Sequence, residues 1–441
     1  MTTNPRPIEL ITSDWHMMFH AWKQREELCG DAECVLSQVV HAAHTRNLPI
    51  LAAGDLFDSR QPAVEIMVAT GELLRDIDGD YIMGNHDRRP TPWMKLVAPH
   101  WNDLVRQPIE RVPQDVPENM ENTIQGERVL GPLFETEKVW HIYGLNYIDY
   151  ANRLMDELDD LAGEIEPDPS VARLLVLHQA CEALMPVGKF QLTDDMIPDC
   201  FDLVVVGDWH CPTIFTLRGK SGRPIPCLAP GGFHLTSIRE EPMKKLFTLY
   251  SDGGIGAEPL VTRRVINVDL YGMSEDDVSH KANLILDSVL NSTTTRPVEI
   301  NRPIVVADLD TGTTSQAESI LRETLGENVH LFLLTEEERK RELELCHIED
   351  IDMEQYAATG YQHAKDVFYQ NEPNPEVQRI VEAFLDNIPS ASLYHALKDK
   401  FLNRHCQPRL SSHPEPGRIS SKGEIDHADH SQGGIREFLP A

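Results

Sequence analysis

The chain has 441 residues, 41% of them hydrophobic and 25% charged, and 71 acidic side chains against 40 basic ones give it a formal charge of -31. This length and composition exclude a single small core and predict a globular protein of two or three domains. The acidic balance argues against a protein that coats nucleic acid by bulk charge, yet it allows an enzyme that meets phosphates through bound cations.

The sequence also gives expectations about the compartment. No apolar run is long enough to cross a bilayer, and the first residues lack the apolar core of a signal peptide, so we expect a cytoplasmic protein with no membrane segment. The 8 cysteines include no C-x-x-C pair. We therefore expect reduced thiols, mostly buried, rather than a disulfide framework or a zinc ribbon.

Strands and helices alternate over the first 90 residues. The hydrophobic spacing predicts strands at 8–13, 48–53 and 81–83, and helices at 31–46 and from residue 62 to about 74. This pattern is typical of an α/β arrangement, in which sites lie at the carboxyl ends of the strands. Polar residues follow all three strands: Asp14 and His16, then Asp55, then Asn85, His86 and Asp87.

The pattern resumes after residues 106–137, which we expect to form a loop or edge-strand excursion. Strands are predicted at 139–145, 173–177, 202–206 and 246–250, and an acidic amphipathic helix at 154–165. His178 follows the second of these strands, and Asp208 and His210 follow the third. These residues repeat the ligand chemistry of the amino-terminal strand ends.

We place a domain boundary near residue 261, because the ligand-type motifs stop there. Strands at 265–268, 303–307 and 329–334, with helices at 278–290 and 314–325, predict a small α+β domain, and Ser274 with Asp277 predicts a capping box. We expect a first domain, with the ligand-type motifs, at 1–261 and the small domain at 262–335. Charged and amphipathic helices are expected at 336–403, and a disordered tail at 404–441.

The strand-end residues suit hydrolysis of a phosphate ester. Two metal ions about 3.5 to 4 Å apart can neutralise the phosphate oxygens and lower the pKa of a bound water. We expect Asp55 to bridge two divalent ions. The other expected ligands are Asp14, His16 and His210 for one ion, and Asn85, His178 and Asp208 for the second. Oxygen and imidazole ligands without thiolates suit Mn²⁺, our first expectation, followed by Mg²⁺, Fe²⁺ or Zn²⁺.

The series D-x-H, G-D-x-x-D, G-N-H-D, a strand-end His and G-x-x-H resembles the calcineurin-like metallophosphoesterases. Within them, residues 8–250 are most similar to the DNA-repair nucleases of the Mre11 and SbcD group, including bacteriophage members. The resemblance implies a metallophosphoesterase sandwich of two mixed β-sheets flanked by helices, followed by a small α+β capping domain and C-terminal helices.

The same resemblance implies an activity and partners. It implies a Mn²⁺-dependent exonuclease or endonuclease that hydrolyses DNA in repair or recombination, as a homodimer, with an SbcC or Rad50-like ATPase bound by the C-terminal helices. His86 would serve the leaving group as proton donor or transition-state stabiliser, and Asp87 would orient it. One departure stands out: the family motif reads G-H-x-H, whereas this chain has Asp208 at the first His. A carboxylate there still binds a hard cation, and shifts the preference towards manganese or magnesium.

Other interpretations stay open for single motifs. Asn85-His86-Asp87 alone could form a turn, and His178 alone could be a core histidine. His20, His141 and His234 could line the site. Tryptophans near the motifs (Trp15, Trp93 and Trp209) could stack on a base or pack in the floor. Basic residues that could contact a DNA backbone, or be scattered surface charge, are Arg88, Arg89, Lys95, Arg218, Lys220, Arg223, Arg239, Lys244 and Lys245.

Two rival functions also stay open. One is a phosphodiesterase or phosphatase acting on small nucleotides, which the acidic balance favours. The other is an inactive scaffold, which only Asp208 encourages.

Overall fold

A computed structural model describes residues 5–18, 28–88, 92–105, 107–113, 127–185, 190–236, 243–292, 300–309 and 314–335. The chain divides into a compact unit Met1–Leu333 and a second unit Leu334–Ala441. The predicted helices between 336 and 403 and the predicted tail 404–441 lie outside the described residues, so both stay predictions.

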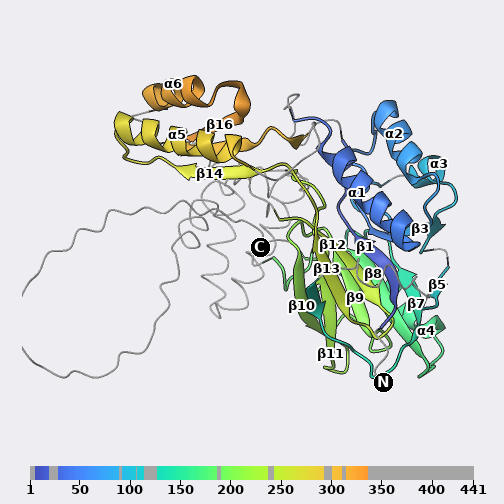
Figure 1. Cartoon of the computed structure of the whole chain (residues 1–441). Helices are drawn as coiled ribbons and strands as arrows, with labels where there is room; N and C mark the ends of the chain where they lie inside the picture. The colour runs from blue at the N-terminus through green and yellow to red at the C-terminus, as the bar shows by residue number, and fades with distance from the viewer. Residues whose placement is uncertain are drawn as a thin grey trace, which may run out of the picture. The chain divides into compact units, whose positions relative to one another are not determined.

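The first of two large sheets contains the amino-terminal strands and is mixed (Figure 1). Its order is β4 (Asn102–Asp103), β3 (Gly79–Ile82), β2 (Ile50–Ala53), β1 (Pro7–Thr12), β12 (Lys245–Tyr250), β13 (Ile255–Pro259) and β6 (Glu127–Leu130). Strands β1 to β4 are parallel, and β12, β13 and β6 continue the sheet in antiparallel pairs. The carboxyl ends of β1, β2 and β3 therefore meet at one edge.

The second sheet is also mixed. Its order is β10 (Thr213–Arg218), β11 (Pro224–Ala229), β9 (Leu203–Gly207), β8 (Val171–His178), β7 (Val139–Gly144) and β5 (Ile109–Arg111). Strands β7, β8, β9 and β11 run parallel, with β5 and β10 antiparallel at the two edges. The β8 strand ends at His178, and β9 ends at Gly207, directly before Asp208.

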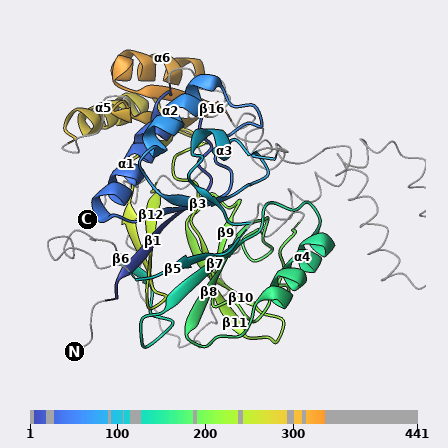
Figure 2. The same cartoon turned by 90° about the vertical axis from the view of Figure 1, so that its right-hand side faces the viewer.

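The two sheets face each other across a continuous apolar core, which includes Ile11 and Leu51 from the first sheet and Leu174 and Val205 from the second. The outer face of the first sheet is covered by α1 (Asp31–Arg46), α2 (Val64–Leu74) and α3 (Met94–Val97), and that of the second by α4 (Ala151–Glu164) (Figure 2). The layers are therefore helices, sheet, sheet and helix, which confirms the predicted α/β class with mixed sheets and flanking helices.

One charged cluster lies inside this sandwich. Glu9 of β1 and Asp80 of β3 are fully buried, and Arg111 of β5 pairs with both: its Nε lies 3.3 Å from Oε2 of Glu9, and Nη2 contacts Asp80. Asn102 donates to Asp80 at 2.8 Å. Burial, and then the charge of Asp80, raise the pKa of the Glu9 carboxyl well above its usual value.

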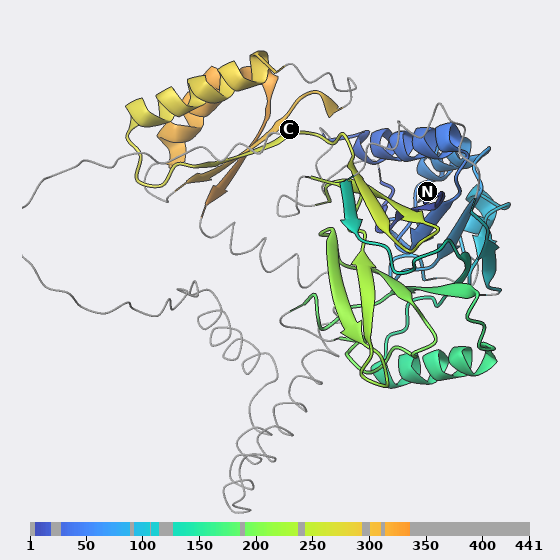
Figure 3. The ribbon, with the colours of Figure 1, turned by 60° about the horizontal axis from the view of Figure 1, so that its bottom comes forward.

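A third sheet forms with β14 (Val265–Asp269), β15 (Ile304–Leu309) and β16 (His330–Thr335). Helices α5 (Glu275–Leu290) and α6 (Thr314–Leu325), with a short 3-10 turn at Gly326–Asn328, share one apolar core with this sheet (Figure 3). The capping box at the start of α5 is present: the Ser274 side chain accepts from the Asp277 amide, and the Asp277 side chain accepts from the Ser274 amide. The predicted α+β elements are confirmed here.

Several predictions of detail differ from the structure. The strands β4, β10, β11 and β13 were not expected from the hydrophobic pattern, and two strands, β5 and β6, lie in the excursion 106–137. Six cysteines are described and all are free, but only Cys181 and Cys227 are buried, so the expectation of mostly buried thiols is wrong for this set. Within the described residues, no helix has the length and apolar character needed to span a bilayer.

Candidate metal centre

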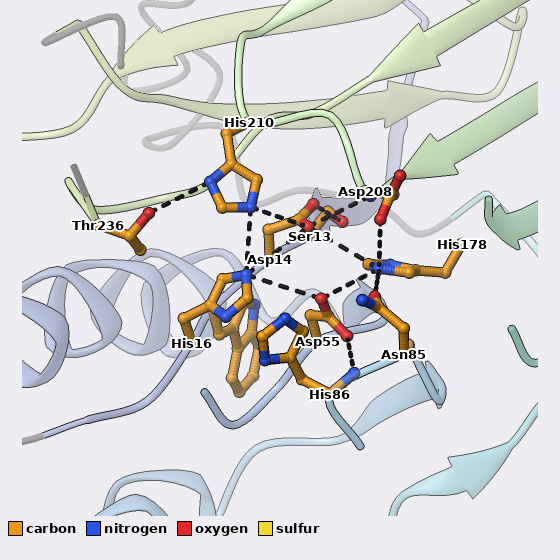
Figure 4. Close-up of polar contacts among 12 residues, drawn as sticks. Ser13, Asp14, His16, Asp55, Asn85, His86, His178, Asp208, His210 and Thr236 are labelled. Carbon is orange, nitrogen blue, oxygen red and sulfur yellow. Dashed lines mark hydrogen bonds and ion pairs between the residues drawn. The ribbon is translucent and has the colours of Figure 1, made fainter. Parts of the chain in front are cut away.

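The expected ligands come together at the edge where the parallel strands of both large sheets end (Figure 4). Asp14 and His16 follow β1, Asp55 follows β2, Asn85 follows β3, His178 closes β8, and Asp208 and His210 follow β9. Their side chains form overlapping groups whose ligand atoms lie within 4.8 Å of one another: Asp14, His16 and His210; His16, Asp55 and His86; and Asp14, Asp55 and His178.

The first group converges on Nε2 of His16. This atom lies 3.2 Å from Nε2 of His210, 3.7 Å from Oδ2 of Asp55 and 4.0 Å from Oδ1 of Asp14. Oδ1 of Asp14 is also 3.5 Å from Nε2 of His210. Atoms that bind one ion at about 2.1 Å lie roughly 3 to 4 Å apart, so this spacing fits a shared cation.

The second group converges on Nε2 of His178. This atom lies 3.1 Å from Oδ1 of Asn85, 3.2 Å from Oδ2 of Asp55 and 3.8 Å from Oδ1 of Asp208. On the other side of the ring, Nδ1 donates to the carbonyl of Ala53 at 2.8 Å. That bond leaves Nε2 to face the cluster, as in histidines that bind metals. The Asp208 carboxylate therefore does reach the second group.

Asp55 belongs to both groups and is buried between three imidazoles. Burial alone would raise the pKa of its carboxyl, but the neighbouring His178, followed by His16 and His86, lowers that pKa well below the usual value. Conversely, burial would lower the pKa of His178, but the negative charge of nearby carboxylates, Asp55 first, raises it well above the usual value. The surroundings therefore favour a charged carboxylate at the residue that the sequence predicts as the bridging ligand.

The backbone around the site adopts unusual conformations. Asp14, His16, Asp55 and Asp208 all have positive φ angles, of 50°, 40°, 50° and 78°. Side chains with a Cβ rarely adopt this left-handed region, and such strain concentrates at functional sites. A Cβ on Gly84 would overlap the Asp55 carboxylate. The glycine of the G-N-H-D motif is thus needed for the close approach of β2 and β3.

His86 lies beside the first group, with its ring centroid 4.9 Å from that of His16. Its amide donates to Oδ1 of Asp55 at 2.9 Å, and its Nδ1 donates to the carbonyl of Asp58 at 2.7 Å. Asp58 also approaches His16, with Oδ1 3.4 Å from Nδ1 of that ring. Asp58, the last residue of G-D-x-x-D, therefore contacts both imidazoles, a role that the sequence analysis did not assign.

The role expected for Asp87 needs correction. Its carboxylate accepts hydrogen bonds from the backbone amides of Leu56, Phe57 and Gly84, at 3.0, 3.2 and 3.2 Å. Burial and the charge of Asp55 raise the pKa of Asp87 to about 6, although these amides act in the opposite direction. Asp87 thus joins the loops after β2 and β3, while the hydrogen bond that fixes the His86 ring goes to Asp58.

The remaining sequence candidates have different positions. Lys244 is fully buried, with Nζ 3.4 Å from the carbonyl of His210, so its assignment as a surface residue for DNA was wrong. Trp15 is also fully buried and packs against Phe233 and Trp101. His234 is buried behind the site instead of lining it.

Two of the other basic candidates are already engaged: Arg88 pairs with Asp149, and Lys220 with Asp159. His141 lies 3.5 Å from Oε2 of Glu110, on β7 and β5. His20, Arg89 and Arg239 lie outside the described residues.

The donor set fits divalent cations. Three carboxylates face three imidazoles and one amide oxygen, so the cluster is negative whenever the imidazoles are neutral. Nδ1 of His16 is buried without a hydrogen bond, and its Nε2 lies 3.2 Å from the Nε2 of a second imidazole. Without an ion, one imidazole can donate to the other across this distance, and with both nitrogens unprotonated the pair can bind a shared cation.

Comparison with known proteins adds little. The chain matches no family model and no curated protein. Matches are found among 45 chains of solved structures. One crystal structure covers 58% of this chain and 100% of its own, at 10% identity and a TM-score of 0.29. A likeness at that level carries no argument, so the family expected from the motifs stays a prediction.

Proposed function

We propose that the protein is a metal-dependent phosphodiesterase of the calcineurin-like type, and within it a DNA nuclease of the Mre11 and SbcD type. One observation carries the proposal: Oδ2 of Asp55 lies between the ligand atoms of two groups, 3.7 Å from Nε2 of His16 and 3.2 Å from Nε2 of His178. A carboxylate shared in this way is what a pair of ions acting on one phosphate requires.

The fold supports the proposal. Two mixed sheets with helices on their outer faces are the arrangement that the motif resemblance implies, and the cluster lies where the parallel strands end. When bound, the two cations would neutralise the phosphate oxygens and activate a water. We assign Mn²⁺ to this role, with Mg²⁺, Fe²⁺ and Zn²⁺ as the alternatives to be compared.

The protein's own residues perform the remaining tasks. His86 donates from Nδ1 to the Asp58 carbonyl, which directs Nε2 away from the backbone. In the doubly protonated imidazolium, Nε2 would carry the proton that passes to the leaving oxygen, and the ring would be left neutral with its Nδ1 proton still on the Asp58 carbonyl. Asp55 holds the His86 amide at 2.9 Å, so the general acid and the bridging carboxylate are fixed to each other. Asp87 keeps the two loops together from behind.

Nuclease activity is tested with purified protein and Mn²⁺ on linear duplex DNA, single-stranded DNA and a cyclic dinucleotide in parallel. The proposal expects turnover of the DNA substrates. Turnover of the cyclic dinucleotide alone would instead support the small-nucleotide alternative, and no turnover of any substrate, with both ions bound, would support the inactive scaffold.

The partners are part of the same proposal. We propose a homodimer that binds an SbcC or Rad50-like ATPase through the region 336–403. Light scattering measures whether the protein is a dimer. Co-purification of the ATPase with the full chain and with a chain truncated before Pro375 tests where the ATPase binds. Association that persists in the truncated protein would contradict the placement of the ATPase site.

A further inference from the structure

The segment 231–236, which follows β11, runs directly behind the first ligand group. Gly232 forms a β-bridge with Ser13, and its amide donates to the carbonyl of His210 at 3.2 Å. Thr236 Oγ1 lies 3.3 Å from Nδ1 of His210. This segment therefore contacts both loops that supply ligands to the first group, the loop after β1 and the loop after β9.

His234 lies at the centre of this segment and is 1% exposed. Its Nε2 lies 2.8 Å from the carbonyl oxygen of Trp15 and 3.3 Å from that of His16. The other ring nitrogen, Nδ1, lies 3.2 Å from the carbonyl oxygen of Leu235. A carbonyl oxygen only accepts, so we assign the proton to Nε2, which makes the shorter contact and donates to Trp15. A ring nitrogen that donates to the backbone in this way cannot also bind a metal, which separates His234 from the ligand histidines.

The peptide group between Trp15 and His16, whose carbonyl accepts from His234, helps to set the conformation of the Asp14–His16 loop. The Trp15 carbonyl belongs to the peptide plane from which the φ angle of His16 is measured, and that angle is 40°. The same loop is held on its other side by the bond from the His16 amide to the Asp55 carbonyl at 2.9 Å. The left-handed conformation is unfavourable for a residue with a Cβ, so it depends on such contacts.

We propose that His234 is a positioning residue for the first metal ion, which holds the Asp14–His16 loop in its left-handed conformation through the Trp15 carbonyl. This inference rests on the proposed metal-binding function. Without the bond, the His16 ring would no longer face His210, and the first group would lose its geometry. The second group would be affected less: Asp14 also reaches His178 and the Asp208 amide, but the His178 ring is held separately by the Ala53 carbonyl.

The test compares three substitutions by titrating metal-free protein with Mn²⁺ in a calorimeter and recording the electron paramagnetic resonance spectrum of the spin-coupled pair. Gln places its amide nitrogen where His has Nε2, so His234→Gln should keep both ions and the coupled spectrum. His234→Asn cannot reach the Trp15 carbonyl, and His234→Phe has no donor. Both of these variants should bind the first ion about 10- to 100-fold more weakly, which is the effect of losing a group that orients ligands. Their electron paramagnetic resonance spectra should be uncoupled.

The matched control is His141→Phe, in which the replaced histidine lies on β7 near Glu110. It should bind both ions as the wild type does. Thermal unfolding of each metal-free variant is measured alongside. Unchanged binding of both ions in His234→Asn and His234→Phe would overturn the inference. So would an equal loss of both ions with a lower melting temperature, because that result describes general destabilisation. If the wild type binds no Mn²⁺, the proposed function fails instead.

Discussion

Oδ2 of Asp55 lies 3.2 Å from Nε2 of His178, in a pair that joins the end of β2 in one sheet to the end of β8 in the other. Each group shifts the pKa of the other, downward for the carboxyl of Asp55 and upward for the imidazole of His178, so the pairing favours a charged carboxylate beside a charged imidazole. In the proposed function, a divalent cation would take the place of the proton in this pair. Asp55 is thus the residue on which both proposed ions would depend.

Asp55→Asn is therefore expected to reduce Mn²⁺-dependent DNA hydrolysis by more than about 10³-fold, because the neutral amide cannot balance two cations. The spin-coupled Mn²⁺ signal should disappear, while the circular dichroism spectrum stays that of the wild type. Asp159→Asn, at an exposed position on α4, is the matched control and should be fully active. Substantial hydrolysis by Asp55→Asn would contradict the two-ion assignment.

His86→Ser separates chemistry from metal binding. The substitution should leave two bound ions, counted by elemental analysis, and lower DNA hydrolysis by about 10² to 10⁴-fold, the usual contribution of a general acid. A p-nitrophenyl ester of thymidine monophosphate has a leaving group that needs no proton, so the rate at which His86→Ser hydrolyses this substrate should fall much less. Loss of an ion from His86→Ser would show that His86 is a ligand, as its position within one of the metal-type groups permits.

Asp208 stands where the motif that this sequence resembles has a histidine, and its Oδ1 lies 3.8 Å from Nε2 of His178. Asp208→Ala should weaken the second ion by at least about tenfold, since even groups that only orient a ligand contribute that much. Asp208→His should restore the ion with a preference moved from Mg²⁺ towards Zn²⁺, because a nitrogen replaces an oxygen donor. Equal affinities for both ions in Asp208→Ala and the wild type would remove Asp208 from the site.

The gathering of the candidate ligands could be predicted from the sequence because each lies at or just after the end of an apolar strand, and parallel strands bring their carboxyl ends to one edge. The bounds of α1 were also predictable, since apolar residues recur at helical spacing between Gly30 and Asn47, which both adopt left-handed conformations. The short edge strand β10 was not, because its residues alternate between partly buried and exposed without a strong apolar pattern.

The sequence could not predict the hydrogen bonds that hold the ligand loops in place, for a different reason. Asp87 bonds to amides that lie 30 and 31 residues away, and His234 bonds to a carbonyl 219 residues away. Neither partner is marked by its residue type, because every residue offers a backbone amide or carbonyl. Only the fold shows which of them a side chain meets. Glu9 is a similar case, since its cationic partner Arg111 is 102 residues distant.

Glu9 makes the stability of the fold depend on pH. Burial, then the charge of Asp80, raise the pKa of its carboxyl well above the ordinary 4.5, and Arg111 offsets this only in part. At pH values between 4.5 and the raised pKa, the folded protein therefore retains a proton on Glu9 that the unfolded chain has released. This contribution to stability is fully present below pH 4.5 and is lost as the pH rises through the raised pKa of the folded state.

Glu9→Gln should remove this dependence, because the amide keeps the shape and the donor of the protonated carboxyl but does not titrate. From about pH 5 to about pH 9, the free energy of unfolding of the wild type should fall relative to that of Glu9→Gln. Urea denaturation of metal-free protein at both pH values measures the difference. Glu110→Gln, at an exposed position on the neighbouring strand β5, is the matched control and should follow the wild type. Parallel pH profiles for the wild type and Glu9→Gln would show that the buried cluster holds Glu9 ionised, with Arg111 outweighing the effects of burial and Asp80.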